Sequence, residues 1–247
     1  MLRPAGEKPT LLLLGYGERY PALSGRILLL QFRTLRAEGV EDAVDRLRAT
    51  SEPVRAVLLP VPPPLDDPIR DAARLREAGP REGLQLVAVG ARPDARGIDR
   101  LRKAGLRFAC FEPWTDSELR FILNRAIYDP GRARIKVRDG LRVPTNLMGR
   151  VFGGAGEKPV LIYNVSLGGA YLETHRPNPV GARIEVELPL PDGPIRIQGR
   201  VVSTNVPGNL RRPNLPLGMG VRFENSDATA RERLESYVTE RARDFEL

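Results

Sequence analysis

The chain has 247 residues, of which 41% are hydrophobic and 28% charged, and it contains a single cysteine. This composition excludes wholesale disorder and a disulfide-stapled fold, and the length suits one large domain or two of ordinary size. The formal net charge of +8 favours an anionic partner, but nucleic acid, a membrane surface and a small phosphorylated ligand are all compatible with charge alone.

The beginning of the chain, "MLRPAGEKPTLLLLGYGERY", contains a run of four leucines that ends at Gly15. This run is too short for the apolar core of a signal peptide and far too short for a membrane span. Cys110 lies in the apolar stretch "FACF", which is typical of a small buried side chain and fits a reducing compartment. We therefore expect a cytoplasmic protein with no membrane span.

Residues 8–129 alternate short apolar runs with helical patterns. Buried strands are predicted for "PTLLLLG", "VRAVLLPV" and "LQLVAVG". Apolar residues recur at three- and four-residue spacing in "VEDAVDRLRAT", "IRDAARLREAG", "GIDRLRKAG" and "SELRFILNRAI", as in amphipathic helices. Such alternation predicts a parallel sheet with helices on both faces.

From about residue 142 the pattern changes to strands, separated by glycine and proline turns: "VPTNLMGRVF", "KPVLIYNVS", "GAYLET", "ARIEVELPL", "IRIQGRVVSTN" and "GMGVRF". This spacing predicts a sandwich or a barrel. A final helix is predicted in "DATARERLESYVTERARDF", with Ser226 or Asp227 as its N-cap. The segment "YDPGRARIKVRDG" marks a boundary, so we predict domains at 8–129 and 130–247.

In this order of elements the first half resembles a response-regulator receiver domain, on "TLRAEGVEDAVDRLR", "VRAVLLPVPPP" and "AGLRFACFEPWTDSELRFIL". Receivers accept a phosphoryl group on an aspartate after the third strand, beside a metal held by acidic residues and near a lysine. The corresponding positions here hold Pro60, the stretch 15–18 ("GYGE") and Glu112. Proline is no nucleophile and a glutamate repels phosphate, so we expect a degenerate (pseudo-)receiver. Its remaining use is a docking or dimerisation surface, or a structural partner for the second half.

The stretch "YNVSLGGAYLET" interrupts a strand pattern with a serine and two glycines, which mark a bulge, a bend, or the close approach of a ligand or another backbone. "NVSLGG" places Asn164, Ser166 and Gly169 in the pattern Asp/Asn-x-Ser-x-x-Gly, and "RDGLRVP" places Arg138 and Arg142 four apart. With "GMGVRF" downstream, the second half resembles a PilZ domain, a bacterial module whose members often bind cyclic di-GMP.

The resemblance implies a cyclic di-GMP site on this half of the chain. An arginine offers a planar fork that bridges phosphate oxygens or the guanine edge, while its flat face stacks on a base. Serine and asparagine add short hydrogen-bonding groups, and glycines let the backbone and the purine approach closely. Arg134 and Arg138 form an overlapping second pair to Arg138 and Arg142. The implied site residues are Arg134, Arg138, Arg142, Asn164, Ser166, Gly168 and Gly169.

The predicted fold is thus an α/β receiver-like parallel-sheet domain followed by an all-β PilZ barrel with a C-terminal helix. We expect a bacterial signalling protein that binds cyclic di-GMP and relays the signal to an unidentified protein partner. The alternative is a nucleotide-independent scaffold that acts only through protein partners. Nucleic acid is disfavoured, because the basic cluster at 132–142 lacks interleaved aromatic residues.

No enzyme, metal site or cofactor is expected. The one histidine, His175, lies in the polar turn "ETHRPNP", and without a second histidine a metal site has little support. No pattern in the sequence pairs a nucleophile with a catalytic base. The oligomeric state is left open by the sequence.

Overall fold

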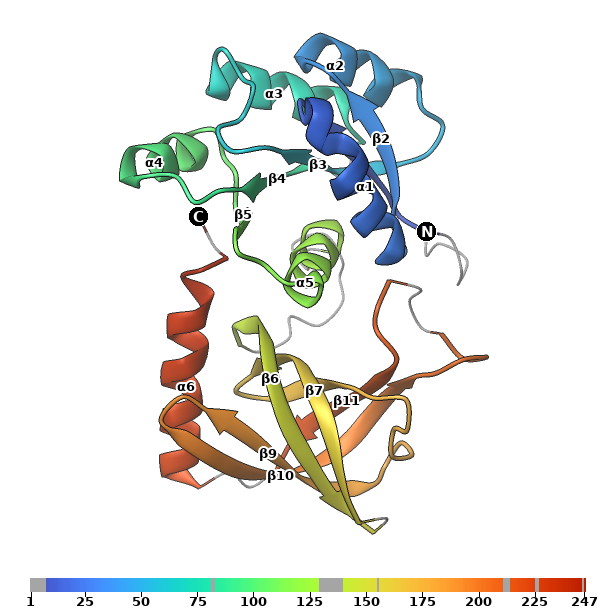
Figure 1. Cartoon of the computed structure of the whole chain (residues 1–247), viewed down its shortest axis with the longest axis vertical. Coiled ribbons are helices and arrows are strands. Elements are labelled where there is room, and N and C mark those ends of the chain that lie inside the picture. The colour runs from blue at the N-terminus through green and yellow to red at the C-terminus, as the bar shows by residue number, and fades with distance from the viewer. Residues whose placement is uncertain are drawn as a thin grey trace. The chain divides into compact units, whose positions relative to one another are not determined.

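The computed structural model describes residues 8–80, 83–128, 140–154, 156–210, 214–224, 227–245 and 247. They separate into two compact units. The sheet unit holds the described residues of 7–137 together with those of Asp244–Leu247, and the barrel unit holds those of 138–243. The predicted fold class is confirmed, since a parallel α/β sheet precedes a closed barrel and a C-terminal helix (Figure 1).

The sheet unit is built on five parallel strands in the order β2-β1-β3-β4-β5. Every residue of the interior strand β1 is buried, because helices cover both faces of a parallel sheet. This burial explains why β1 is a continuous apolar run. The strands are β1 (Thr10–Leu14), β2 (Arg33–Ala37), β3 (Val54–Leu59), β4 (Gln85–Gly90) and β5 (Phe108–Phe111).

Helices lie on both faces of this sheet, with α2 and α3 on one face and α1 and α5 on the other (Figure 1). They are α1 (Tyr20–Leu29), α2 (Val40–Ala49), α3 (Pro68–Ala78), α4 (Ala95–Lys103) and α5 (Asp116–Ile127), and a short 3-10 helix η1 (Gly17–Arg19) precedes α1. Sequence analysis did not predict α1. Leu28 and Leu29 are 49% and 74% exposed, so the apolar residues of α1 do not mark one buried face.

The chain ends in the sheet unit. The backbone N–H of Ala109 donates to the carbonyl oxygen of Phe245 at 3.1 Å, and that of Leu247 donates to the carbonyl oxygen of Arg107 at 3.4 Å. Phe245 is buried, and Leu247 packs against the core. Because β5 is an edge strand, this C-terminal segment covers a row of backbone groups that would otherwise be open to pairing.

The barrel unit closes six antiparallel strands in the order β10-β11-β8-β7-β6-β9. The strand pattern of the sequence predicted either a sandwich or a barrel, and the structure is a closed barrel. Closure removes the edges of the sheet. Side chains of β9 alternate between the core and the outside, as a strand with one buried face requires. The strands are β6 (Arg142–Gly153), β7 (Gly156–Ser166), β8 (Gly169–Glu173), β9 (Arg183–Leu190), β10 (Gly193–Asn205) and β11 (Gly218–Phe223).

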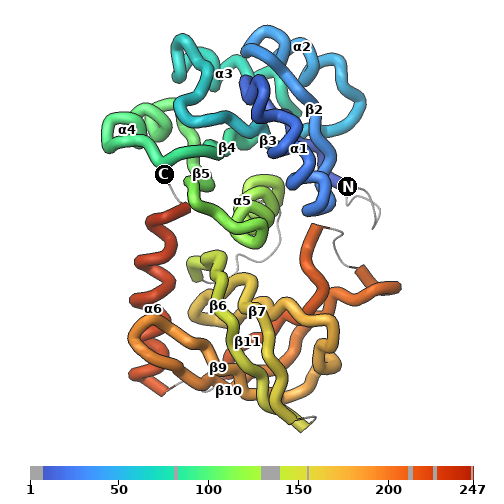
Figure 2. The backbone as a smooth tube through the Cα atoms, in the orientation of Figure 1, coloured from blue at the N-terminus to red at the C-terminus, as the bar shows by residue number. Residues whose placement is uncertain are grey.

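The helix α6 (Ala228–Ala242) lies beside these strands (Figure 2). Leu234 and Val238 belong to the barrel core. Asp227 is the N-cap, since its carboxylate accepts from the backbone N–H of Ala230 at 2.7 Å. In the part of the chain that the structure describes, no helix combines the length and the apolar composition needed to cross a bilayer.

Candidate functional site

Three residues of the predicted ligand site lie side by side around one end of the barrel. Arg142, the first residue of β6, is opposite Ser166 at the end of β7, and Ser166 is opposite Gly169 at the start of β8. Directly opposite residues of antiparallel strands face the same side. The next residues along β6 and β8, Val143 and Ala170, lie in the core. The three site residues therefore face the outside of the barrel.

Asn164 joins this group through a side-chain hydrogen bond. Nη1 of Arg142 donates to Oδ1 of Asn164 at 2.7 Å. Asn164 precedes Ser166 by two positions on β7 and therefore faces the same side. It is only 5% exposed, so the amide orients the guanidinium from within the wall of the barrel. A neutral amide does not cancel the charge of the arginine.

Ser166 is buried, and its hydroxyl donates to the carbonyl oxygen of Gly169 at 3.1 Å. This bond closes the turn between β7 and β8. A hydroxyl has one proton and two lone pairs. The proton of the Ser166 hydroxyl therefore serves the turn, and the oxygen keeps its acceptor lone pairs.

The two glycines of the turn differ in their surroundings. A Cβ on Gly169 would collide with the backbone carbonyl oxygen of Val221 and would lie 3.2 Å from Cα of Arg222. Gly168 is exposed, and a Cβ there would meet nothing within 4 Å. The close approach of β11 thus explains Gly169. Gly168 leaves the surface of this turn open.

Arg134 and Arg138 lie outside the described residues, as do all of residues 129–139. The structure therefore brings together Arg142, Asn164, Ser166, Gly168 and Gly169 of the predicted site. The row of opposite residues also reaches Arg222 on β11, which pairs with Gly169. Sequence analysis did not single out Arg222, because only the pairing of β8 with β11 brings it to the site.

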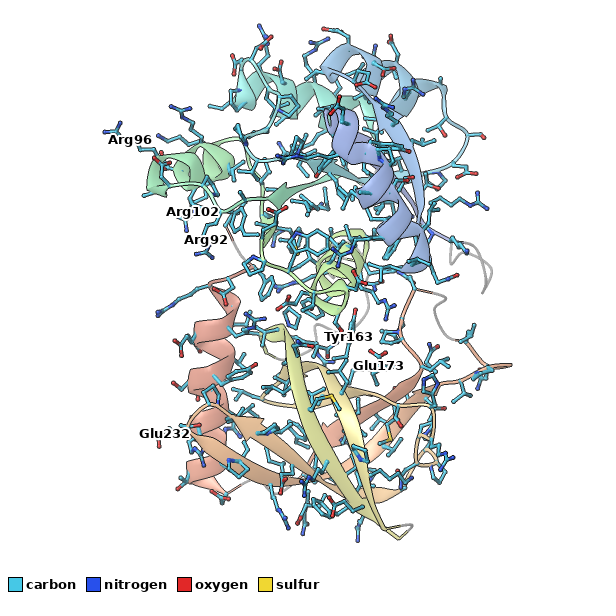
Figure 3. The ribbon with its side chains drawn as sticks, viewed as in Figure 1. Arg92, Arg96, Arg102, Tyr163, Glu173 and Glu232 are labelled. Atoms are coloured by element: carbon cyan, nitrogen blue, oxygen red, sulfur yellow. The ribbon has the colours of Figure 1, made fainter. Side chains whose placement is uncertain are left out.

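Two buried tyrosines pack against each other beside Asn164. The ring of Tyr163 (Figure 3) meets that of Tyr171 edge-on, with centroids 5.9 Å apart and an interplanar angle of 77°. The Tyr171 hydroxyl donates to the carbonyl oxygen of Pro216 at 2.7 Å. Burial, with a smaller effect of Glu173, raises the pKa of Tyr171. The phenol therefore stays protonated as a donor that joins β8 to the segment before β11.

The carboxyl edge of the sheet is the place where a receiver would carry its phosphorylation chemistry. Tyr16 follows β1 there and is buried, and its hydroxyl donates to the carbonyl oxygen of Val89 at 3.4 Å. Burial raises the pKa of Tyr16 well above its ordinary range, and Cys110 and Glu112 add to the rise. The neutral phenol ring therefore fills space near the ends of β4 and β5.

The loop after β3 closes over the same edge. Gly15 has a φ of 75°, and a Cβ there would collide with the ring of Pro64. The described residues contain no group of three or more His, Cys, Asp or Glu side chains that could hold a metal ion. At this edge the ring of Tyr16 is buried and the ring of Pro64 lies against Gly15.

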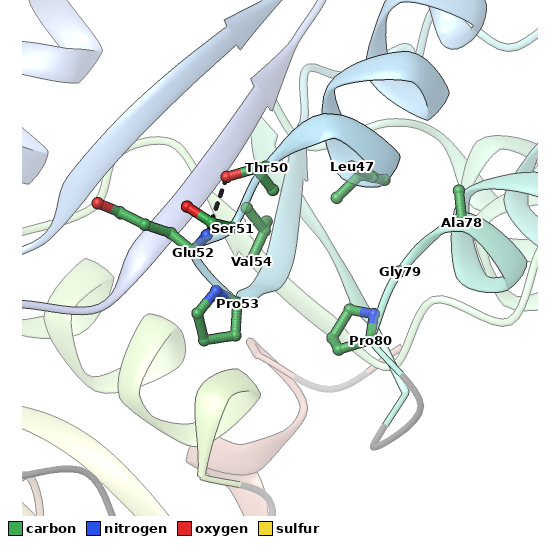
Figure 4. Close-up of a pocket in the computed structure, with 9 residues that line it drawn as sticks. All are labelled: Leu47, Thr50, Ser51, Glu52, Pro53, Val54, Ala78, Gly79 and Pro80. Carbon is green, nitrogen blue, oxygen red and sulfur yellow. Dashed lines mark hydrogen bonds between the residues drawn. The ribbon is translucent and has the colours of Figure 1, made fainter.

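A depression of about 160 Å³ lies at the opposite, amino edge of the sheet, at the start of β3 (Figure 4). Thr50, Glu52 and Pro80 are among its lining residues, and none of the predicted site residues is. Ligand pockets commonly measure about 300–1,000 Å³, so this depression is small for a dinucleotide.

Comparison with known proteins gives a family for the second half of the chain. Residues 136–240 match the model of the PilZ domain family. None of the curated proteins matches the chain.

Solved structures similar to the chain come from both types of domain. The Bacillus subtilis inhibitor of motility MotI/DgrA shares 21% identity over 45% of this chain and 54% of its own, with a TM-score of 0.37. The cyclic di-GMP-bound PilZ domain of YcgR from Escherichia coli shares 20% identity over 44% and 94%, with a TM-score of 0.36. The signal receiver domain of an HD domain-containing protein from Pseudomonas fluorescens shares 19% over 55% and 98%, with a TM-score of 0.44. The chain spans about half the length of the Bacillus protein.

Proposed function

We propose, from the membership of residues 136–240 in the PilZ family, that the chain is a bacterial signalling adaptor that binds cyclic di-GMP on its barrel. A PilZ domain is a binding and signalling module and not an enzyme. In this proposal the bound nucleotide changes how the chain engages a protein partner. A cytoplasmic location is part of the proposal, and a single buried cysteine is compatible with it.

The observation that carries the proposal is the grouping of Arg142, Asn164 and Ser166 on the outside of the barrel, next to the open surface at Gly168. Arg142 supplies charge and a fork for a phosphate or a guanine edge. Asn164 orients this fork through its hydrogen bond to Arg142, and Ser166 supplies an acceptor. We assign Arg138 and Arg134 to the same site, as further cations from the segment that precedes β6.

The free energies involved indicate that Arg142 supplies a large part of the binding free energy. A hydrogen bond to a charged group contributes about 1.5–3 kcal/mol, and micromolar affinity corresponds to about 8 kcal/mol. Loss of Arg142 is therefore expected to weaken binding by one to two orders of magnitude, since about 1.4 kcal/mol is tenfold.

Calorimetry with cyclic di-GMP tests the proposal on the wild-type chain, Arg142→Ala and Arg150→Ala. Arg150 is a matched control, because it is an exposed arginine on the same strand. Saturable binding by the wild type and by Arg150→Ala, and its loss in Arg142→Ala, is the expected result. Absence of heat with the wild-type chain would overturn the proposal. Partner capture that is the same with and without nucleotide would favour the nucleotide-independent scaffold instead.

We also propose that the sheet unit is a pseudo-receiver. Support comes from Pro60 at the expected phosphoacceptor position, Glu112 at the lysine position and the buried ring of Tyr16, whose pKa Glu112 helps to raise. Incubation with acetyl phosphate and Mg²⁺ is expected to leave the intact mass unchanged, while an ordinary receiver treated in parallel gains a phosphoryl group. A stable phosphorylated species of the chain would contradict this assignment.

A further inference from the structure

Residues that lie directly opposite each other on neighbouring strands form a row around the barrel, and this row continues past the candidate site. Gly169 is opposite Arg222 on β11, Arg222 is opposite Arg200 on β10, and Arg200 is opposite Arg183 on β9. The next residues on these strands belong to the barrel core: Val221, Val201 and Ile184. The side chains of the three arginines, which we call the arginine row, therefore face outward like Arg142 and Ser166.

Like charges directly opposite each other on neighbouring strands destabilise a sheet. In the arginine row, Glu224 bridges two of the three cations. Its Oε1 lies 3.0 Å from Nε of Arg200 and 3.6 Å from Nη2 of Arg222. The hydrogen bond from Arg200, with the charges of Arg200, Arg222 and Arg183, lowers the pKa of the Glu224 carboxyl. Three guanidiniums and one carboxylate give the cluster a formal excess of positive charge.

The arginines of the row differ in how firmly they are held. Arg200 donates to Glu224 and, at 3.2 Å, to the carbonyl oxygen of Gly181. Arg222 reaches Glu224 at the longer distance, and its side chain is 63% exposed. Arg222 is therefore the member of the row best placed to turn toward a ligand. Glu224 connects it to Arg200.

Between Arg142 and Arg222 the row contains a short side chain, Ser166, and no side chain at Gly169. Neighbouring strands lie about 4.8 Å apart, so three strand spacings place the two arginines roughly 14 Å apart along the surface. The long side chains of Arg142 and Arg222 thus flank a stretch of surface without large side chains, at Ser166, Gly168 and Gly169, which we call the saddle. A ligand with two phosphates and two guanines is long enough to bridge such a saddle.

We propose that Arg222 is a second arm of the nucleotide site, contacting a phosphate or a guanine edge of the ligand held at Arg142, and that Arg200 positions it through Glu224. This inference rests on the proposed function and adds residues that the sequence motif does not contain. Arg183, one strand further from the saddle than Arg200, makes no ligand contact in this arrangement.

Titration of the full chain with cyclic di-GMP tests the inference on wild type, Arg222→Ala, Arg222→Lys and Arg183→Ala. Arg183→Ala is the matched control, because it removes the same charge from the same row. We expect Arg222→Ala to weaken binding about tenfold or more and Arg183→Ala to change it less than about twofold, a tenfold loss being about 1.4 kcal/mol. Arg222→Lys keeps the charge without the fork, so an intermediate affinity is expected.

Equal affinities of wild type and both Arg222 variants, with binding still lost in Arg142→Ala, would overturn this inference and leave the proposed function standing. Equal losses in Arg222→Ala and Arg183→Ala would also overturn it, because they indicate a general effect of charge. No binding by the wild-type chain would overturn both. Unfolding midpoints of the variants separate lost contacts from lost structure, and Arg222→Lys serves as the readout if the alanine variant is unstable.

Discussion

At the scale of single residues, Asn164 sets the position of Arg142. The buried amide oxygen receives Nη1 of the arginine, and this contact restricts the guanidinium to one side of the site. When a residue acts only by orienting another, its removal weakens ligand binding only while that partner is present, so the two substitutions are not additive.

Replacement of Asn164 by alanine is therefore expected to weaken cyclic di-GMP binding severalfold, and the double variant Asn164→Ala/Arg142→Ala is expected to bind no worse than Arg142→Ala alone. Calorimetry on the four proteins gives the coupling free energy. Losses that simply add would show that Asn164 contacts the ligand independently of Arg142.

The adjacent glycines give a second test at this scale. Gly169→Ala brings a methyl group against the backbone of β11, and we expect it to destabilise the barrel by about 1–3 kcal/mol. Gly168→Ala meets open space, so its effect on stability is expected within about 0.5 kcal/mol, and any loss of affinity reports on ligand approach. Thermal unfolding and titration of both variants measure the two effects. Equal destabilisation by the two substitutions would refute the distinction between a structural role for Gly169 and an open surface at Gly168.

The resemblance to the PilZ motif identified Asn164 and Ser166 from the sequence. The structure places them on one face, because residues two apart on a strand share a face. Arg222 was not predictable in the same way. Its proximity to Gly169 depends on the pairing of β8 with β11, which joins segments far apart in the chain, and register is fixed only when the barrel closes. The burial of Tyr16 was missed for a similar reason, since it depends on β4 and β5 lying beside the loop after β1.

At the scale of elements, strands and helices with one regular buried face were predictable from periodicity, and α1 was not. α6 was predicted together with its N-cap, but the sequence does not reveal how the helix is attached to the barrel. Arg233 on α6 forms a two-pronged contact with Asp192, at 2.7 and 2.9 Å, in the turn between β9 and β10.

The hydrogen bond from Arg233 lowers the pKa of the Asp192 carboxyl from its ordinary value of 3.8. A carboxyl whose pKa is lower in the folded state stabilises that state above its unfolded pKa, and this contribution is lost as the pH falls through the folded pKa. Asp192→Asn is therefore expected to reduce stability slightly near pH 7 and to reduce it less at an acidic pH below the ordinary carboxyl pKa of 3.8. Urea unfolding of both proteins at the two pH values measures the difference. A difference that is equally large in acid would contradict this origin.

At the scale of the whole molecule, the sheet unit is discontinuous in sequence. The described residues of 7–137 form one compact unit with the described residues of Asp244–Leu247. The buried ring of Phe245 and the two backbone bonds to β5 carry this attachment.

Phe245→Ala is expected to destabilise the sheet unit by about 3 kcal/mol, because it empties a buried aromatic site. Leu29→Ala is the control in the same unit, since Leu29 is exposed and its loss is expected to change stability by less than about 0.5 kcal/mol. Thermal unfolding followed by calorimetry distinguishes the two. Similar midpoints for Phe245→Ala and the wild type would show that the C-terminal segment does not contribute.

The late position of Phe245 also bears on synthesis. A ribosome adds about 5–20 residues per second, and domains fold as they emerge. The strands of the sheet unit leave the ribosome first, whereas the segment that covers β5 is made only after the whole barrel, a delay on the order of ten seconds. During that interval the edge of β5 is open to other nascent chains, so the nascent protein depends on rapid completion, or on a chaperone, to keep this edge from pairing with another molecule.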